Sequence, residues 1–141
     1  MDALQRIVVL FESFGPQDVP RLGTYYREDA AFKDPLHAVR GIDAIRAVYQ
    51  HMFDAMDAPR FVVTHRFANG PDCVLVWEFS FVLRGYPRKG TLTMHGVSHL
   101  LLDADGRIAV HRDYWDAAEE VYEKIPVLGA LMRWLKRRAG A

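Results

Sequence analysis

The chain has almost no cysteine, no excess of either charge and no long apolar run, and each shortage excludes a class of protein. Cys73 is the single cysteine among 141 residues, so neither an intrachain disulfide nor a cysteine-rich zinc site can form. Eighteen basic residues balance eighteen acidic ones, which removes the positive field that nucleic-acid binders use. We therefore expect a protein of a reducing compartment that does not bind nucleic acid.

Several functional motifs are missing as well. The sequence has no Gly-rich phosphate loop, no Gly-x-Ser-x-Gly elbow and no His or acidic cluster with metal-ligand spacing. Its first residues, MDALQRIVVLFESF, include Asp2 and Glu12 and contain no apolar stretch of signal-peptide or membrane-spanning length. These features predict a cytoplasmic protein without metal or cofactor.

What is present is enough apolar surface for one core. Half of the residues are hydrophobic and 12% are aromatic, and the aromatic residues are spread over the whole length. Helical spacing of apolar residues occurs at 4–14, 18–27 and 42–56, whereas residues 60–68, 73–84, 90–102 and 107–116 alternate as strands do. A short extended piece, 30–34, ends before Pro35. Helices followed by an antiparallel meander predict the α+β class, with a curved antiparallel sheet around the N-terminal helices.

The last 25 residues are predicted to form a helical extension, 117–141, that packs on the domain formed by residues 1–116. Pro126 divides the extension into two short helices, and an apolar stripe runs through both. This stripe could cover the mouth of a pocket, contact a second subunit or lie on a membrane surface, and the short length makes membrane contact the least favoured. We expect a homodimer that forms through the outer face of the sheet.

Two segments resemble the ketosteroid isomerases of the nuclear transport factor 2-like superfamily. They are YYREDAAFKDPLHAVRGIDAIRAVYQ, residues 25–50, and DADGRIAVHRDYWD, residues 103–116. The resemblance covers most of residues 1–116 and implies a cone-shaped fold with one apolar pocket. It also implies that Asp34, in the Asp-Pro pair, is a general base that moves a proton next to a ketone. The positions of the two oxyanion donors in those enzymes are occupied here by Leu10 or Phe11 and by Ser98.

Other branches of the superfamily point to further residues. The run HRDYWD resembles the limonene epoxide hydrolases, in which an Asp at the position of Asp113 helps to activate water. The SnoaL-like polyketide cyclases use a His and an Asp on their last strands, and His111 and Asp113 are similar to these in kind. The scytalone dehydratases have a catalytic His in a run that resembles Thr64-His65-Arg66-Phe67.

Strand alternation predicts which of these side chains face the pocket. It places Phe61, Val63, His65 and Phe67 inside, and likewise Trp77, Phe79, Phe81, Met94, Gly96, Ser98, Leu100, His111, Asp113 and Trp115. The catalytic candidates are Asp34, Asp113, His111 and His65. The candidates for substrate contact are Trp77, Phe79, Ser98, Trp115, Tyr25 and Met94.

Each catalytic candidate also has a structural interpretation. Asp34 could cap a loop, because Asp before Pro is a common turn element. Asp113 could bond a neighbouring side chain and tie the sheet together, and either His could be a satisfied core residue. A His beside an Asp is, however, a minimal proton-transfer pair.

The sequence thus favours cofactor-independent acid–base catalysis, as in an isomerase, cyclase or dehydratase, on a small apolar carbonyl compound. Two alternatives remain open. One is a protein that binds a lipid-like or aromatic molecule without chemistry, and the other is a dimerisation or partner-binding module.

Overall fold

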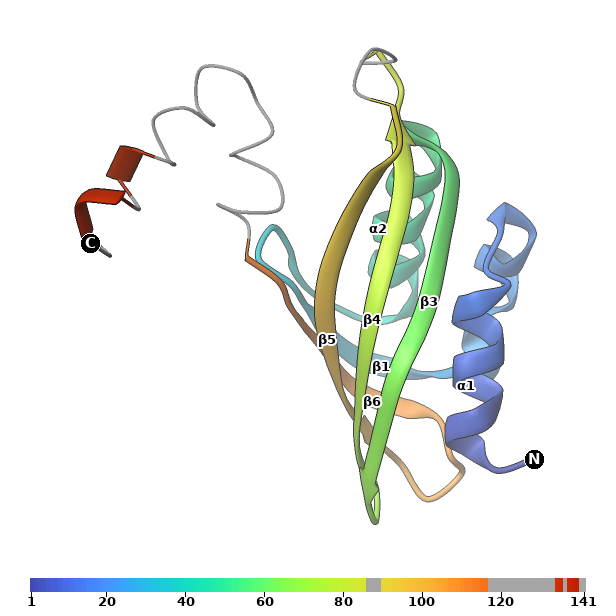
Figure 1. Ribbon diagram of the computed structural model, residues 1–141. Helices are drawn as coiled ribbons and strands as arrows, with labels where there is room; N and C mark the ends of the chain where they lie inside the picture. Colours follow the sequence, from blue (N-terminus) through green and yellow to red (C-terminus); the bar gives the residue numbers. More distant parts are fainter. Residues whose placement is uncertain (86–89, 117–133, 136, 140–141) are drawn as a thin grey trace.

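The structure is a computed structural model that describes residues 1–85, 90–116, 134–135 and 137–139. Most of the predicted helical extension, 117–141, lies outside the described residues. The described part begins with two helical segments, continues through two strands and a helix, and ends with four long strands (Figure 1).

The N-terminal helix α1 (Ala3–Glu12) forms where helical spacing predicts it. Asp2 caps it by accepting a hydrogen bond from the backbone N–H of Gln5 at 2.8 Å. One face buries Ile7 and Phe11 against the sheet. The second predicted helix is a 3₁₀ helix, η1 (Pro16–Thr24), and it is shorter than expected because the chain enters strand β1 (Tyr26–Lys33) directly afterwards.

Helix α2 (Ile42–Ala55) follows the short strand β2 (Ala38–Arg40). Its N-cap residue, Gly41, has φ of 95°, a backbone conformation that favours glycine. Three residues of the predicted apolar stripe are buried, namely Ile45, Tyr49 and Phe53. The helix ends at Ala55, and strand β3 (Met56–Asn69) begins before Pro59, earlier than the sequence predicts.

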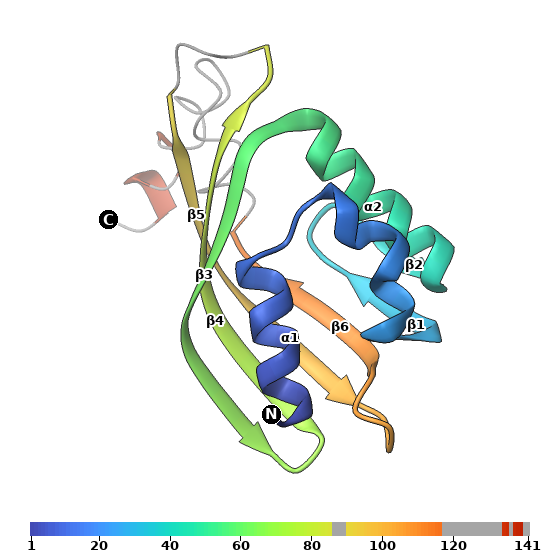
Figure 2. The same cartoon turned by 90° about the vertical axis from the view of Figure 1, so that its right-hand side faces the viewer.

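The remaining strands are β4 (Asp72–Leu83), β5 (Leu92–Leu102) and β6 (Ile108–Tyr114). The six strands form one sheet in the order β2-β1-β6-β5-β4-β3. The sheet curves around α1, η1 and α2, which lie together on its concave side (Figure 2). The predicted α+β class and wrapped sheet are confirmed. One pairing differs from the predicted antiparallel pattern, because β1 joins β6 in parallel and makes the sheet mixed.

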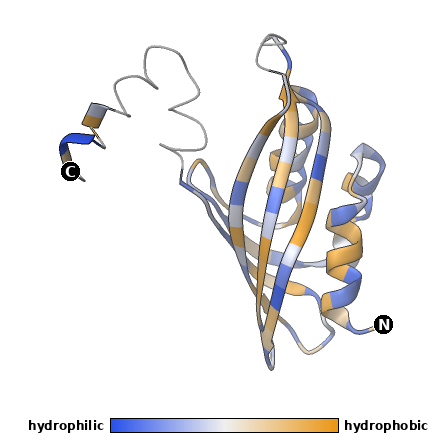
Figure 3. Ribbon diagram, viewed as in Figure 1, coloured by the Kyte–Doolittle hydropathy of each residue, from blue (hydrophilic) through white to orange (hydrophobic). Residues whose placement is uncertain are grey.

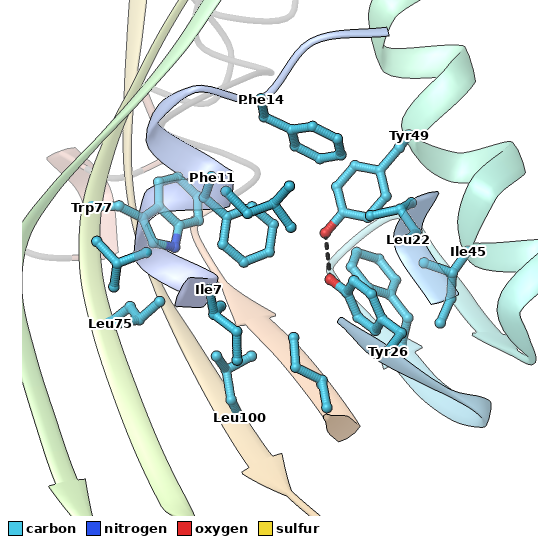
Figure 4. Packing of buried hydrophobic residues seen from close by; sticks show 14 of the residues in the cluster. Ile7, Phe11, Phe14, Leu22, Tyr26, Ile45, Tyr49, Leu75, Trp77 and Leu100 are labelled. Carbon is cyan, nitrogen blue, oxygen red and sulfur yellow. Dashed lines mark hydrogen bonds between the residues drawn. The ribbon is translucent and has the colours of Figure 1, made fainter. Parts of the chain in front are cut away.

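Buried and more exposed residues alternate along β4 and β5, and the ribbon of these strands carries both hydrophobic and hydrophilic residues (Figure 3). On β4 the buried positions are Cys73, Leu75, Trp77, Phe79 and Phe81, which confirms the predicted inner face. The same holds for Met94, Ser98 and Leu100 on β5 and for His111 on β6. These inner faces and the helices enclose the apolar core (Figure 4). No helix in the described part of the chain has the length and apolar character needed to cross a bilayer.

Candidate active site

A cavity of about 490 Å³ lies between α2 and the inner faces of the strands. This volume falls in the usual range for small-molecule sites. Its walls are mostly apolar and include Phe11, Val48, Met52, Phe61, Trp77, Phe79 and Met94. The polar residues that line it are Asp34, His37, Tyr49, His51, Ser98, His111 and Asp113, and no Lys or Arg occurs among the described lining residues. The cavity is therefore suited to a mainly apolar molecule without a negative charge.

Asp113 accepts two hydrogen bonds at the polar end of this cavity. Ser98, which is directly opposite on β5, donates its hydroxyl to Oδ1 of Asp113 at 2.5 Å. Nε2 of His111 lies 2.6 Å from the same oxygen. Both of these bonds end at Oδ1, which leaves Oδ2 as the carboxylate oxygen that could take a proton from a ligand.

The indole of Trp77 extends this set of bonds to β4. Its Nε1–H donates to the hydroxyl oxygen of Ser98 at 2.9 Å. Because an indole nitrogen only donates, the hydroxyl hydrogen of Ser98 remains committed to Asp113. The hydroxyl of Ser98 therefore donates to Asp113 and is not directed at a developing oxyanion of a substrate.

Gly96 makes room for this indole. It faces Trp77 across the β4–β5 ladder, and a Cβ atom at Gly96 would lie 2.3 Å from the Trp77 ring. Any larger residue would displace the indole, so the glycine fixes where the Trp77 N–H points.

On its other side, His111 contacts two tyrosines. Nδ1 of His111 lies 2.6 Å from the hydroxyl of Tyr26, which in turn lies 2.7 Å from the hydroxyl of Tyr49 (Figure 4). All three residues are at most 5% exposed. Burial raises the pKa of both Tyr26 and Tyr49 well above the ordinary value for tyrosine, and the charge of Asp113 raises both further. Both tyrosines therefore remain neutral hydroxyl groups over the physiological range.

Asp34 caps a loop and also lines the cavity. Its Oδ1 accepts hydrogen bonds from the backbone N–H groups of Leu36 and His37 at 2.8 and 2.6 Å, which is the loop-capping role. The ring Nδ1 of His37 lies 2.9 Å from the same oxygen, and both side chains line the cavity. A second carboxylate–imidazole pair is thus present at the site.

The parallel pairing of β1 and β6 brings Asp34 to Asp113. Phe32 pairs with His111 and Lys33 with Arg112, so Asp34, which directly follows β1, continues toward the level of Asp113 on β6. Both residues line the cavity. The parallel register therefore brings the two carboxylates to the same end of the cavity, whereas an antiparallel pairing would not have done so.

Most of the predicted site residues are brought together by the fold. The cavity is lined by Asp34, Asp113, His111, Trp77, Phe79, Ser98, Trp115 and Met94. Two candidates, His65 and Tyr25, lie elsewhere.

His65 is exposed because β3 contains a bulge at Thr64. Val63 pairs with Trp77, but His65 pairs with Val76, so one residue is skipped and the following side chains change face. The His65 ring stacks on Phe67, which is 60% exposed. The prediction that His65 and Phe67 face inward is therefore wrong.

Tyr25 is half-buried and is not among the lining residues; its neighbour Tyr26 takes the inner position. The sequence pattern extended the second helix through both tyrosines, whereas β1 begins at Tyr26 and fixes which of the two points inward.

Sequence reasoning missed Tyr26, Tyr49 and His37 as site residues. Tyr49 belongs to the apolar stripe of α2, where an aromatic residue is ordinarily core. The sequence does contain a signal for His37, because a polar residue three positions after the Asp of an Asp-Pro pair is within reach of the Asp side chain. Among the described residues, no group of three or more His, Cys, Asp or Glu side chains has a geometry that could hold a metal ion.

The fold and cavity define the class as nuclear transport factor 2-like, and comparison with known structures agrees. A protein from Catenulispora acidiphila with a ketosteroid isomerase-like fold, solved in complex with trimethylamine, superposes with a TM-score of 0.72. It is 14% identical and the match covers 86% of this chain and 90% of that one. A protein from Shewanella denitrificans named as a SnoaL-like polyketide cyclase gives a TM-score of 0.70 at 20% identity, over 87% and 93% of the two chains. At these identities the likeness shows the fold.

A third similar structure is an LEH-like epoxide hydrolase from M. tuberculosis, with a TM-score of 0.67 at 12% identity. That match covers 95% of this chain and 89% of the other. No curated protein matches the sequence significantly. The profile of the SnoaL-like domain matches residues 8–111, and the chain therefore belongs to the SnoaL-like domain family. The match ends two residues before Asp113.

Proposed function

We propose that the protein catalyses cofactor-independent proton transfer on a small, mostly apolar carbonyl compound, as an isomerase, cyclase or dehydratase does. The observation that supports this most directly is the Asp113–His111 pair, which faces an apolar cavity beside a second carboxylate, Asp34. A carboxylate and an imidazole in contact can accept and return a proton near neutral pH.

In the proposed reaction the apolar body of the substrate lies along Trp77 and Phe79, with its carbonyl group at the polar end. Asp34 takes a proton from the carbon next to the carbonyl, so the C–H bond breaks and its electron pair moves toward the carbonyl oxygen. Asp113, protonated at Oδ2, supplies a proton to that oxygen while its Oδ1 keeps the hydrogen bonds from Ser98 and His111. Asp34 returns the proton it took to the same carbon or to a second one. Protonation limits the negative charge on the carbonyl oxygen. This is needed because neither oxyanion-donor position supplies a hydrogen bond: Ser98 donates to Asp113, and the first position holds an apolar residue.

Exchange with solvent deuterium tests this proposal without knowledge of the substrate. Apolar cyclic and aryl ketones are incubated with the protein in D₂O, and NMR follows loss of the α-hydrogen signal. We expect enzyme-dependent exchange that falls about 10²- to 10⁴-fold in Asp34→Asn and in Asp113→Asn. Asp29→Asn is the matched control, because Asp29 is an exposed residue of β1, the strand that leads directly into Asp34. Exchange that persists in both site variants would overturn the assignment.

The commitment of the Ser98 hydroxyl to Asp113 favours a second candidate function, binding without chemistry. The Catenulispora neighbour, whose complex contains trimethylamine, supports the idea that proteins of this fold bind small molecules. Under this alternative, calorimetric affinity for an apolar ligand is unchanged in Asp113→Asn, and no ketone undergoes exchange.

We further propose that two copies associate through the outer face of the sheet. Val110 and Tyr114 expose apolar surface there, at 40% and 49%. Val110→Lys should then convert a dimer to a monomer in analytical ultracentrifugation. Deleting residues 117–141 separates this interface from one made by the C-terminal segment, because loss of the dimer in the deletion alone would assign the contact to that segment.

A further inference from the structure

The hydroxyl groups of Tyr26 and Tyr49 form the inner end of a continuous set of hydrogen bonds. The set runs from Trp77 through Ser98, Asp113 and His111 to these two tyrosines, and so connects β4, β5, β6, β1 and α2. The proposed reaction uses Asp113 and His111 and assigns no role to either tyrosine.

The donors in this set can be assigned from chemistry. Ser98 donates to Asp113 because its oxygen already accepts from Trp77. Oδ1 of Asp113 already accepts from Ser98 and so carries no hydrogen, and its contact with His111 therefore requires a hydrogen on Nε2. A neutral imidazole with its hydrogen on Nε2 has a bare Nδ1, which must accept. The hydroxyl of Tyr26, 2.6 Å away, is the group that can donate to it.

Tyr49 completes the order of donors. Once Tyr26 has given its single hydrogen to His111, the 2.7 Å contact between the hydroxyls requires Tyr49 to donate to Tyr26. Hydrogen bonds thus point from both ends of the set toward Oδ1 of Asp113. The raised pKa of both phenols keeps these hydrogens in place.

We propose that Tyr26, supported by Tyr49, is a positioning residue that holds His111 in its Nε2–H form and thereby keeps Oδ1 of Asp113 as a hydrogen-bond acceptor, with Oδ2 left for proton exchange. This inference rests on the proposed function for its purpose, but its geometry stands apart from any turnover. Tyr26 is fully buried and is not among the lining residues, so it acts on a substrate only through His111.

Long-range ¹H–¹⁵N correlation NMR of the histidine rings tests the proposal directly. The two neutral tautomers give different patterns, and a His111→Asn variant identifies the His111 signals. At a pH where the imidazole is neutral, we expect the Nε2–H pattern in the unaltered protein. Tyr26→Phe should convert it to a mixture of tautomers, because Nδ1 loses its donor, and Tyr49→Phe should cause a smaller change. Tyr114→Phe, on the outer face of β6, is the control and should leave the pattern unchanged.

Either an Nδ1–H pattern in the unaltered protein or an unchanged pattern in Tyr26→Phe would overturn the proposal. Tyr49→Phe retains the Tyr26–His111 bond, so it and the unaltered protein decide the question even where Tyr26→Phe does not fold. A ketone that undergoes exchange adds a kinetic test, in which Tyr26→Phe lowers kcat about tenfold or more without raising KM. If no ketone undergoes exchange but the tautomer behaves as described, the proposed function fails and the positioning role of Tyr26 stands.

Discussion

The two ends of the cavity are built on the same strands but differ in every chemical respect. At one end Ser98 on β5 pairs with Asp113 on β6, and their side chains are bonded to each other, to Trp77 on β4 and to His111 on β6. At the other end Leu92 on β5 pairs with Phe81 on β4, and the adjacent lining residues are Met56 and Leu83. Leu92 and Ser98 are six positions apart on β5, a distance of roughly 20 Å along an extended strand.

This difference shows how one buried face can combine an apolar core with a set of hydrogen-bonded polar side chains. We call the end at Ser98 and Asp113 the near end and the end at Leu92 and Phe81 the far end. Apolar side chains at the far end need only to pack, so each contributes to stability through burial and can be altered separately. Polar side chains at the near end must all be satisfied at once, because a buried donor or acceptor without a partner is costly. Changes at the near end should therefore affect chemistry, and changes at the far end should affect stability.

The largest effect on exchange activity is expected from a substitution of Asp113 at the near end. Asp113→Asn keeps the shape of the side chain but replaces one carboxylate oxygen with an amide NH₂ group. The side chain can then no longer take up or release a proton. We expect exchange activity to fall about 10³-fold, which corresponds to roughly 4 kcal/mol of transition-state stabilisation. Circular dichroism and thermal unfolding should show a folded protein with near-normal stability. A variant with full activity would mean that the two ends do not differ in function.

A substitution among the buried apolar residues should lower the stability of the fold. Phe79 is 4% exposed and stacks on Phe61 at 4.2 Å and on Phe81 at 5.1 Å. Phe79→Ala should lower the free energy of unfolding by about 3 kcal/mol, as measured by urea denaturation. Val76→Ala is the control, because Val76 lies on the outer side of the same strand and should cost clearly less. Equal losses in the two variants would contradict the placement of Phe79 in the core.

A substitution between the two ends should affect both properties modestly. Gly96→Ala places a methyl group against the Trp77 ring and should destabilise the fold by about 1–3 kcal/mol, the usual cost of overpacking. It should also weaken the bond from Trp77 to Ser98, which is visible as a shift of the indole N–H resonance. Wild-type stability and an unmoved resonance would show that the glycine is not needed to seat the indole.

The buried tyrosines beside the near end should also make the stability of the fold depend on pH in the alkaline range. The folded-state pKa of Tyr26 and of Tyr49 is raised, so each keeps its proton when the unfolded chain has lost it near the ordinary value of 10.0. Stability should be complete below that pH and fall as the pH rises above it. Ultraviolet titration should therefore show that Tyr26 and Tyr49 ionise only as the protein unfolds. In the Tyr26→Phe, Tyr49→Phe double variant this unfolding-linked ionisation should vanish.

The smallest effect is expected outside the cavity. His65→Ala removes an exposed side chain beyond the bulge in β3, and we expect stability to change by less than about 0.5 kcal/mol and ketone exchange to stay the same. A large loss of exchange would return His65 to the list of catalytic residues.

Sequence patterns predicted the fold class and most of the cavity because both depend on simple periodicity. Alternation on β4, β5 and β6 correctly placed Trp77, Ser98 and His111 on one face. It failed for His65, since a single extra residue at Thr64 reverses the parity of a strand without any clear mark in the sequence.

Pairings between distant strands were beyond the reach of periodicity. That Asp34 lies beside Asp113 follows from the parallel register of β1 and β6, and that Tyr26 reaches His111 follows from where β1 begins. Neither fact is a property of a local pattern. Residue type alone indicated that an Asp and a His would be present in a pocket, whereas their partners required the three-dimensional arrangement.

The place of β6 in the sheet has a consequence for how the protein is made. This strand is the last of the six in the sequence, yet it lies between β1 and β5 and pairs with both. The earliest and latest strands must therefore meet before the hydrogen bonds among Tyr26, His111 and Asp113 can form, and contacts over such sequence separations form slowly. A growing chain should stay inert during synthesis until its final strand docks. A split protein, cut between β5 and β6, should regain activity when the missing strand is supplied in trans.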